Sequence, residues 1–143
     1  AALAGHHDET RSAYGSAVLI DSHSMPHEAI EAHSRPGQPR PEVVLGDRYG
    51  VAAGQEVMDR VQAAFEASGL RVVRNAPFAG AYVAQAYGRP SRGVHVVQVE
   101  IDRALYMNEA RVEPLPEFAA FRDLIAGVVA DLVQPSGLAL AAE

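Results

Sequence analysis

Apolar residues recur with two different spacings along this chain of 143 residues. Short apolar or alternating runs are typical of strands, whereas spacing at i, i+3 and i+4 marks one face of a helix. These patterns predict strands over 17–22, 43–46, 70–74 and a segment ending at residue 100, and helices over 54–68 and 117–133, with a helix tail in 1–13 and a short helix over 82–87. Strands interleaved with helices predict an α/β fold with a mainly parallel sheet. At this length we expect one domain, 1–143.

One connection breaks the alternation. Residues 24–42 contain four prolines and form a predicted loop of unusual length for a compact domain. Such long connections are usually functional or mobile.

Composition narrows the class of protein. Apolar residues make up 48% of the chain, and no apolar run is long enough to cross a membrane. The net charge of −6, without a cluster of basic residues, argues against a nucleic-acid partner. All twelve cationic residues are arginine, and cysteine is absent. A zinc site in this chain would therefore use histidine and carboxylate ligands. The absence of cysteine is compatible with a cytoplasmic location, which we expect.

The segment from Val18 to Pro26 ends an apolar run in ionisable residues. In a strand, Leu19, Asp21 and His23 share one face. An aspartate two residues before a histidine, at the carboxyl edge of an α/β sheet, is placed to orient a metal ligand. A solvated Asp-Ser-His turn at an ordinary strand end is the alternative interpretation.

A second apolar run, from Gly93 to Arg103, also ends in ionisable residues. One face carries Val94, Val96, Gln98, Glu100 and Asp102, and it changes from apolar to polar toward the carboxyl end. Ligands of open α/β sheets bind at that edge. A histidine that holds zinc and a glutamate that activates water would suffice for metal-assisted hydrolysis.

The other histidines fit a metal site less well. Adjacent His6 and His7 point in different directions on a helix, so a solvated helix end is the favoured interpretation. His27 and His33 are spaced i, i+6, which is not the i, i+4 spacing of a His-Glu-x-x-His zinc motif. His95 has the opposite strand parity to Glu100 and is expected to pack in the core.

Four strings carry a family resemblance, in order along the chain. They are Leu19-Ile20-Asp21-Ser22-His23-Ser24-Met25-Pro26, the segment Val43 to Gly50, the segment Asn75 to Tyr82, and the segment Gly93 to Met107. Together they cover most of residues 16–109 and resemble the N-formylglutamate amidohydrolase (N-formylglutamate deformylase) family. The resemblance implies a three-layer α/β/α fold with a mixed, mainly parallel sheet, like that of zinc carboxypeptidases and aspartoacylases.

The resemblance also implies an activity and a cofactor. The activity is hydrolysis of the small molecule N-formyl-L-glutamate to formate and L-glutamate, a step of histidine breakdown. The cofactor is Zn²⁺, with His23 as a metal ligand and Glu100 as the general base. Asp21 would orient His23.

Substrate contacts follow from the same resemblance. The loop from Asn75 to Tyr82, including Gly80, would lie over the substrate, with Asn75 donating or accepting a hydrogen bond. Arg103 would either bind a substrate carboxylate or pair with Asp102. The family usually has a second glycine where Ala81 stands and an asparagine where Asp102 stands.

The resemblance covers only the carboxyl-terminal portion of family members. Their first half carries further zinc ligands, and catalytic zinc ordinarily needs three protein ligands. We therefore expect the chain to be a fragment that lacks an N-terminal segment. A related zinc hydrolase of another N-acyl amino acid or peptide, and a non-catalytic remnant of the fold, are the alternatives.

Overall fold

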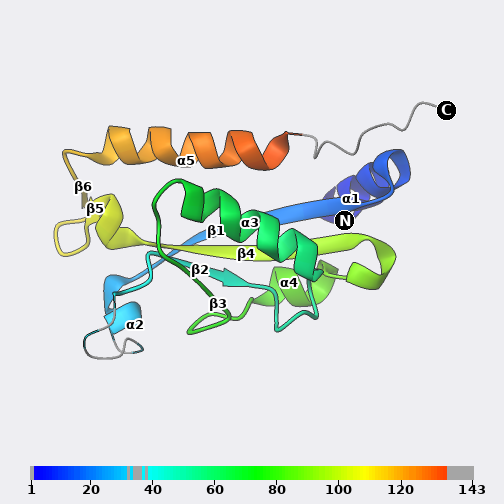
Figure 1. Cartoon of the computed structure of the whole chain (residues 1–143), viewed down its shortest axis with the longest axis horizontal. Helices are drawn as coiled ribbons and strands as arrows, with labels where there is room; N and C mark the ends of the chain where they lie inside the picture. The colour runs from blue at the N-terminus through cyan, green and yellow to red at the C-terminus, as the bar shows by residue number, and fades with distance from the viewer. Residues whose placement is uncertain (1, 32, 34–36, 38, 135–143) are drawn as a thin grey trace.

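Helices and strands alternate in the computed structural model, which describes residues 2–31, 33, 37 and 39–134. Figure 1 shows their arrangement. In chain order they are α1 (Ala2–Tyr14), β1 (Ala17–Met25), α2 (His27–Glu31), β2 (Val43–Gly46), α3 (Gln55–Ala67), β3 (Val72–Arg74), α4 (Tyr82–Tyr87), the 3-10 turn η1 (Pro90–Arg92), β4 (Val94–Asp102), the 3-10 turn η2 (Arg103–Leu105), β5 (Met107–Asn108), β6 (Glu113–Pro114) and α5 (Phe118–Val133). No helix in this part of the chain has the length and hydropathy needed to cross a bilayer.

The main sheet has four strands in the order β1-β4-β2-β3. β1 runs parallel to β4, and β2 runs parallel to β3, whereas β2 and β4 are antiparallel. The fold is therefore α/β with a mixed, mainly parallel sheet, as the sequence predicts. Strand β4 lies between β1 and β2 and pairs with both. Its register therefore fixes which residues of β1 and β2 lie beside each residue of β4.

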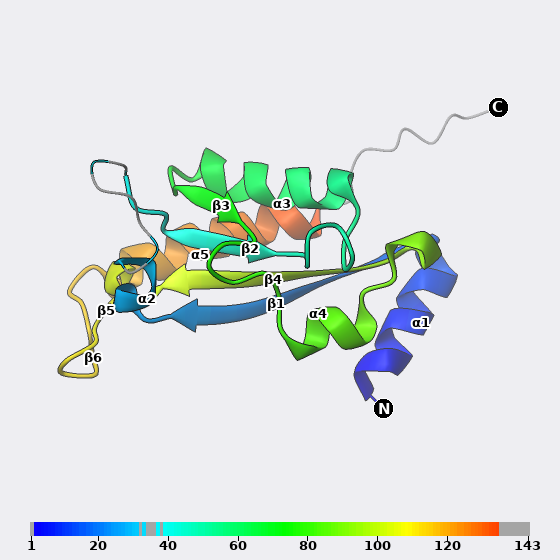
Figure 2. The same ribbon diagram turned by 90° about the horizontal axis from the view of Figure 1, so that it is seen from below.

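Helices α3 and α5 cover one face of this sheet, as Figure 2 shows. Alternate residues of the strands point into the core on this side, which explains their β-branched composition. Val97 and Val99 of β4 pack there with Met58 and Phe65 of α3, all at most 4% exposed. Helix α3 ends where Gly69 takes the left-handed conformation at φ 87°, as the sequence predicts.

The opposite face is covered unevenly. Helices α1 and α4 lie over the region near the starts of β1 and β4, where Leu19 and Val96 pack against Ala84. Farther along, Met25 and Val44 pack against Ile30 of α2. Asp21 and His23 of β1 and Glu100 of β4 lie on this second face, between the two apolar clusters.

Several elements differ from their predicted bounds. Strand β1 continues to Met25 and β4 to Asp102, because both strands stay paired through their polar ends. The connection 24–42 begins with the short helix α2 rather than irregular chain. His7 is not a solvated helix end: it is 8% exposed and its ring meets the ring of Tyr87 edge-on at 5.7 Å.

Candidate active site

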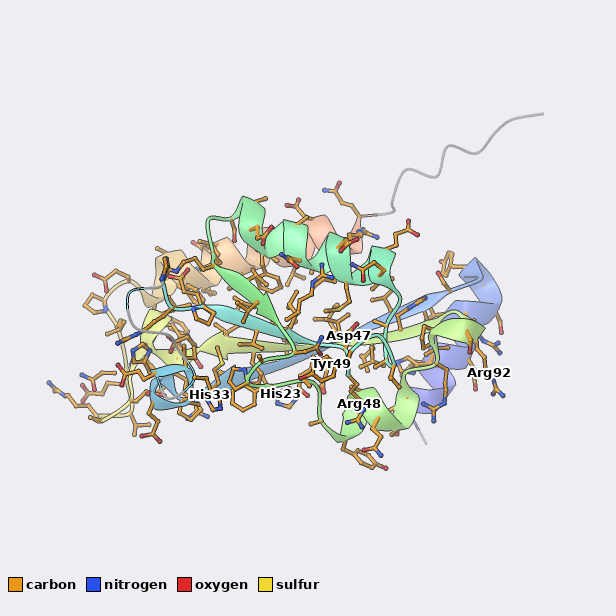
Figure 3. All side chains as sticks on the ribbon, turned by 60° about the horizontal axis from the view of Figure 1, so that its bottom comes forward. His23, His33, Asp47, Arg48, Tyr49 and Arg92 are labelled. Carbon is orange, nitrogen blue, oxygen red and sulfur yellow. The ribbon has the colours of Figure 1, made fainter. Side chains whose placement is uncertain are left out.

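His23 and Glu100 are partners in the parallel register of β1 and β4. Two residues earlier on each strand, Asp21 is the partner of Gln98. Because side chains alternate along strands, these four residues share one face of the sheet. Figure 3 shows His23 on the side away from α3 and α5. The register therefore places His23 and Glu100 side by side near the carboxyl ends of two neighbouring strands.

Asp21 holds the ring of His23. Its Oδ1 lies 3.1 Å from Nε2 of His23, and the aspartate side chain is only 18% exposed whereas that of the histidine is 47% exposed. The second oxygen, Oδ2, is buried without a hydrogen-bond partner among the described residues. A carboxylate behind an exposed imidazole fixes the orientation of the ring and leaves Nδ1 available to a ligand.

The carboxylate of Glu100 is held by its own strand. Gln98, which is 4% exposed, donates from Nε2 to Oε1 of Glu100 over 2.7 Å and accepts the backbone N–H of Ala81 at 2.6 Å. Burial raises the pKa of Glu100, and the charge of Asp21 adds to the rise. His23, the hydrogen bond from Gln98 and Arg103 act in the opposite direction. Burial wins because desolvation disfavours the charged form of a carboxyl group.

The loop that follows β3 crosses this face and closes on the end of β2. The backbone N–H of Arg48 donates to the carbonyl of Ala79 at 2.6 Å. Gly80 has φ 113°, a conformation open to glycine, and Gly46 lies so close that a Cβ there would be 2.5 Å from the nitrogen of Gly80. The two glycines let the loop reach Gln98.

Asn75 occupies the base of this loop. Its carboxamide accepts the backbone N–H groups of Asp47 and Tyr49 at 3.1 and 3.3 Å and donates to the carboxylate of Asp47 at 2.8 Å. Asn75 thus ties the end of β3 to the turn after β2. The predicted hydrogen bond from Asn75 to a substrate stays a prediction, and it would compete with these internal partners.

The remaining predicted substrate residues, Tyr82 and Arg103, have different surroundings. Tyr82 begins α4 and is 74% exposed. Arg103 donates to the carbonyl of Ser24 at 3.2 Å and lies 3.9 Å from Glu109. Of the two roles considered for Arg103, pairing with Asp102 is not what the structure shows.

Asp102 has another partner. Its Oδ2 lies 2.7 Å from Nδ1 of His27, and its Oδ1 accepts the backbone N–H of Ala104. This pair joins α2 to the end of β4. His27 is therefore a structural histidine, in agreement with the rejection of a zinc motif at His27 and His33. His95 lies on the opposite face, as predicted, where it accepts the backbone N–H of Gly54 at 3.0 Å.

The arrangement of the histidine and carboxylate side chains decides whether the described residues can hold a metal ion. In residues 2–31, 33, 37 and 39–134, no group of three or more histidine, aspartate or glutamate side chains is arranged to hold an ion. His23 offers one ligand nitrogen with an orienting carboxylate, and a catalytic zinc ordinarily needs three protein ligands. The described residues therefore do not form a complete three-ligand metal site.

Two neighbours of the predicted residues, Gln98 and Arg48, were given no role from the sequence. Gln98 shares the strand face of Glu100, so its parity was a usable signal. Arg48 gave none, because the loop from Asn75 to Tyr82 that receives it is distant in sequence.

A histidine backed by an aspartate, beside a partly buried glutamate of raised pKa on one face of an α/β sheet, is the kind of site used by hydrolytic enzymes. Comparison with known proteins makes the class specific. Residues 1–107 match the family model described as FGase, N-formylglutamate amidohydrolase. The chain belongs to this family.

Individual relatives agree. The chain is 31% identical over 134 residues to an N-formylglutamate deformylase of Pseudomonas putida, covering 93% of this chain and 44% of the relative. It is also 31% identical over 100 residues to an N-formylglutamate deformylase of Pseudomonas aeruginosa, covering 69% of this chain and 36% of the relative. The chain therefore spans less than half the length of these curated relatives.

A solved structure gives the same result. The crystal structure of N-formylglutamate amidohydrolase from Ralstonia eutropha JMP134 superposes with a TM-score of 0.75 at 31% sequence identity. The match covers 87% of this chain and 45% of that one.

Proposed function

We propose that the protein, in its full natural chain, hydrolyses the formamide bond of N-formyl-L-glutamate to formate and L-glutamate with the help of zinc. Membership of the family and the names of its relatives support the substrate. The observation that carries the chemistry is the register of His23 with Glu100, whose pKa is raised by burial.

Glu100 is the proposed general base. It takes a proton from the attacking water and then gives that proton to the departing nitrogen, so that water and amide become an acid and an amine. A carboxyl group whose pKa is raised toward neutrality can both accept and return a proton at the working pH. Gln98 keeps the accepting oxygen in place.

His23 is the proposed metal ligand of this chain, and Asp21 orients its ring. Further ligands would come from outside the described residues. When bound, zinc would polarise the formyl carbonyl and make water more acidic. The proton transfers would occur on the side of β4, where Glu100 lies.

The test is Glu100→Gln in the full-length protein, with Glu113→Gln as a matched control on the exposed strand β6. We expect release of formate from N-formyl-L-glutamate to fall by about 10²- to 10⁴-fold in Glu100→Gln, the usual contribution of a general base. Zinc content and far-UV circular dichroism should be unchanged, and the control should keep full turnover. Near-wild-type turnover by Glu100→Gln would remove this residue from the role.

A substrate panel tests the other half of the proposal. N-acetyl-L-glutamate and formylated amino acids with apolar side chains are compared with N-formyl-L-glutamate in the wild-type protein. A preference for one of these compounds would assign the site to a different N-acyl amino acid.

A further inference from the structure

Arg48 and Tyr49 follow β2 in a backbone conformation that side chains rarely adopt. Their φ angles are 56° and 57°, in the left-handed region. For residues other than glycine this conformation costs about 1–2 kcal/mol each, so surrounding bonds must impose it. Asn75 accepts the N–H of Tyr49, and Ala79 accepts the N–H of Arg48. The fold therefore holds Arg48 in a strained position.

The side chain of Arg48 lies over the loop that contacts the catalytic face. It is partly buried and donates from one terminal nitrogen to the carbonyl of Gly80 at 3.3 Å. In the part of the chain that the structure describes, Arg48 has no carboxylate partner, whereas Arg71 and Arg74 are each paired at 2.7 Å. A guanidinium group has five N–H donors, so most of those of Arg48 are open to a ligand.

Arg48 is also connected to Glu100 through the loop. It binds the carbonyl of Gly80, and the next N–H in the chain, that of Ala81, binds Gln98. Gln98 in turn holds Glu100. Figure 3 shows Arg48 and His23 on the same side of the sheet, away from α3 and α5. A cation with open donors thus lies on the face that carries the hydrolytic pair.

We propose that Arg48 binds a carboxylate group of the N-acyl amino acid substrate and thereby selects acidic substrates. This inference rests on the proposed function. A planar guanidinium can bind a carboxylate with two parallel hydrogen bonds, which fixes the position of the substrate as well as its charge. Arg48 suits this role better than Arg103, which already lies near Glu109 and binds the carbonyl of Ser24.

The first experiment compares variants on three substrates in the full-length protein. Arg48→Asn removes the charge with a residue that tolerates positive φ, and Arg48→Lys keeps the charge without the planar fork. Arg92→Asn is the control, because Arg92 is exposed and lies toward the other end of the sheet (Figure 3). The substrates are N-formyl-L-glutamate and its two monoamides, N-formyl-L-glutamine and N-formyl-L-isoglutamine.

We expect Arg48→Asn to lower kcat/KM for N-formyl-L-glutamate by about 10- to 100-fold, mainly through KM, the range of a hydrogen bond to a charged group. The kcat/KM of Arg48→Lys should lie between those of the wild type and Arg48→Asn. One monoamide lacks the carboxylate that Arg48 binds, and for that compound the wild type and Arg48→Asn should be equal. The identity of this monoamide assigns the side-chain or the α-carboxylate. Arg92→Asn should behave as the wild type.

Binding of glutarate, measured by calorimetry, separates the inference from the proposed function. If the wild type hydrolyses N-formyl-L-glutamate and Arg48→Asn does so equally well, the inference is overturned and the function stands. Without hydrolysis, glutarate binding that depends on Arg48 supports the carboxylate site and rejects the function. If the wild type does not hydrolyse N-formyl-L-glutamate and glutarate binding does not depend on Arg48, both the inference and the proposed function are rejected. If Arg48→Asn fails to fold by circular dichroism, Arg48→Gly, which suits φ 56°, replaces it in the same comparisons.

Discussion

Gln98 donates a hydrogen bond of 2.7 Å to Oε1 of Glu100, two positions farther along β4. The other end of the same carboxamide accepts the backbone N–H of Ala81 at 2.6 Å. Since an amide that accepts at its oxygen and donates at its nitrogen has one orientation, Ala81 determines which atom Gln98 presents to Glu100. The acidity of Glu100 is thus linked to the backbone of the crossing loop.

Replacing this neutral donor with an acid should change the pH dependence of activity. In Gln98→Glu a second carboxylate lies beside Glu100, and like charges raise the pKa of a carboxyl group. A general base must be ionised, so a raised pKa moves the loss of activity on acidification to higher pH. We expect the acidic limb of kcat/KM to shift upward by about one pH unit. Gln98→Met, which removes the donor without adding a charge, should shift it less. An acidic limb that does not move in Gln98→Glu would contradict this account.

The pair formed by Asp21 and His23 predicts a graded loss of metal. In the full-length protein, His23→Ala should lose zinc, and Asp21→Asn should bind zinc about 10- to 100-fold more weakly because the ring is no longer held by a carboxylate. Zinc content after dialysis, measured by elemental analysis, provides the readout. His33→Ala is the control, since His33 is exposed and bonds to the carbonyl of Ala29. Unchanged zinc in His23→Ala would exclude this histidine as a ligand.

His95 should make stability depend on pH. Burial lowers the pKa of His95 in the folded protein, with Glu56 opposing the effect. The unfolded chain therefore binds the proton more readily, and the stability contributed by neutral His95 is present above the unfolded pKa and lost as pH falls through the folded pKa. We expect the free energy of unfolding of the wild type to fall more between pH 8 and about pH 5 than that of His95→Gln. Urea titrations at the two pH values measure the difference, and parallel losses in both proteins would refute it.

Two glycines should respond in opposite ways to alanine. A Cβ at Gly46 would lie 2.5 Å from the nitrogen of Gly80 and 2.6 Å from the carbonyl carbon of Ala79, so Gly46→Ala must displace the loop. We expect a loss of about 1–3 kcal/mol in stability, together with lower activity. Gly127, in α5, has open space at its Cβ, and Gly127→Ala should stabilise the protein by about 0.5–1 kcal/mol. Urea denaturation of both variants tests the contrast.

The sequence was sufficient for the two long helices and for the faces of the two strands that carry His23 and Glu100. Apolar periodicity placed helices at 54–68 and 117–133, within one residue of the observed ends of α3 and α5. Strand parity placed Asp21 and His23 on one face of their strand, and Gln98 and Glu100 on one face of theirs, because alternation is a local property of the backbone. The pairing of β1 with β4 joins the two faces.

The remaining features depend on contacts between distant segments. The antiparallel direction of β2 relative to β4 leaves no signal in a run such as Val43 to Gly46. The two partners of Gln98, and the engagement of Asn75 by Asp47, arise only once loops cross the sheet. Local patterns cannot report which loop closes on which strand. For the same reason the open donors of Arg48 became visible only in three dimensions.

The position of β4 has a consequence for how the protein acquires its site during synthesis. β4 is the last of the four strands to leave the ribosome, yet it lies between β1 and β2 and pairs with both. A nascent chain that has not reached Val94 can hold β2 beside β3 but cannot join them to β1. Because pairing of segments so distant in sequence is slow, His23 lacks its glutamate partner until β4 has been synthesised and paired. The pairing of His23 with Glu100 should therefore form only in chains in which β4 has inserted between β1 and β2.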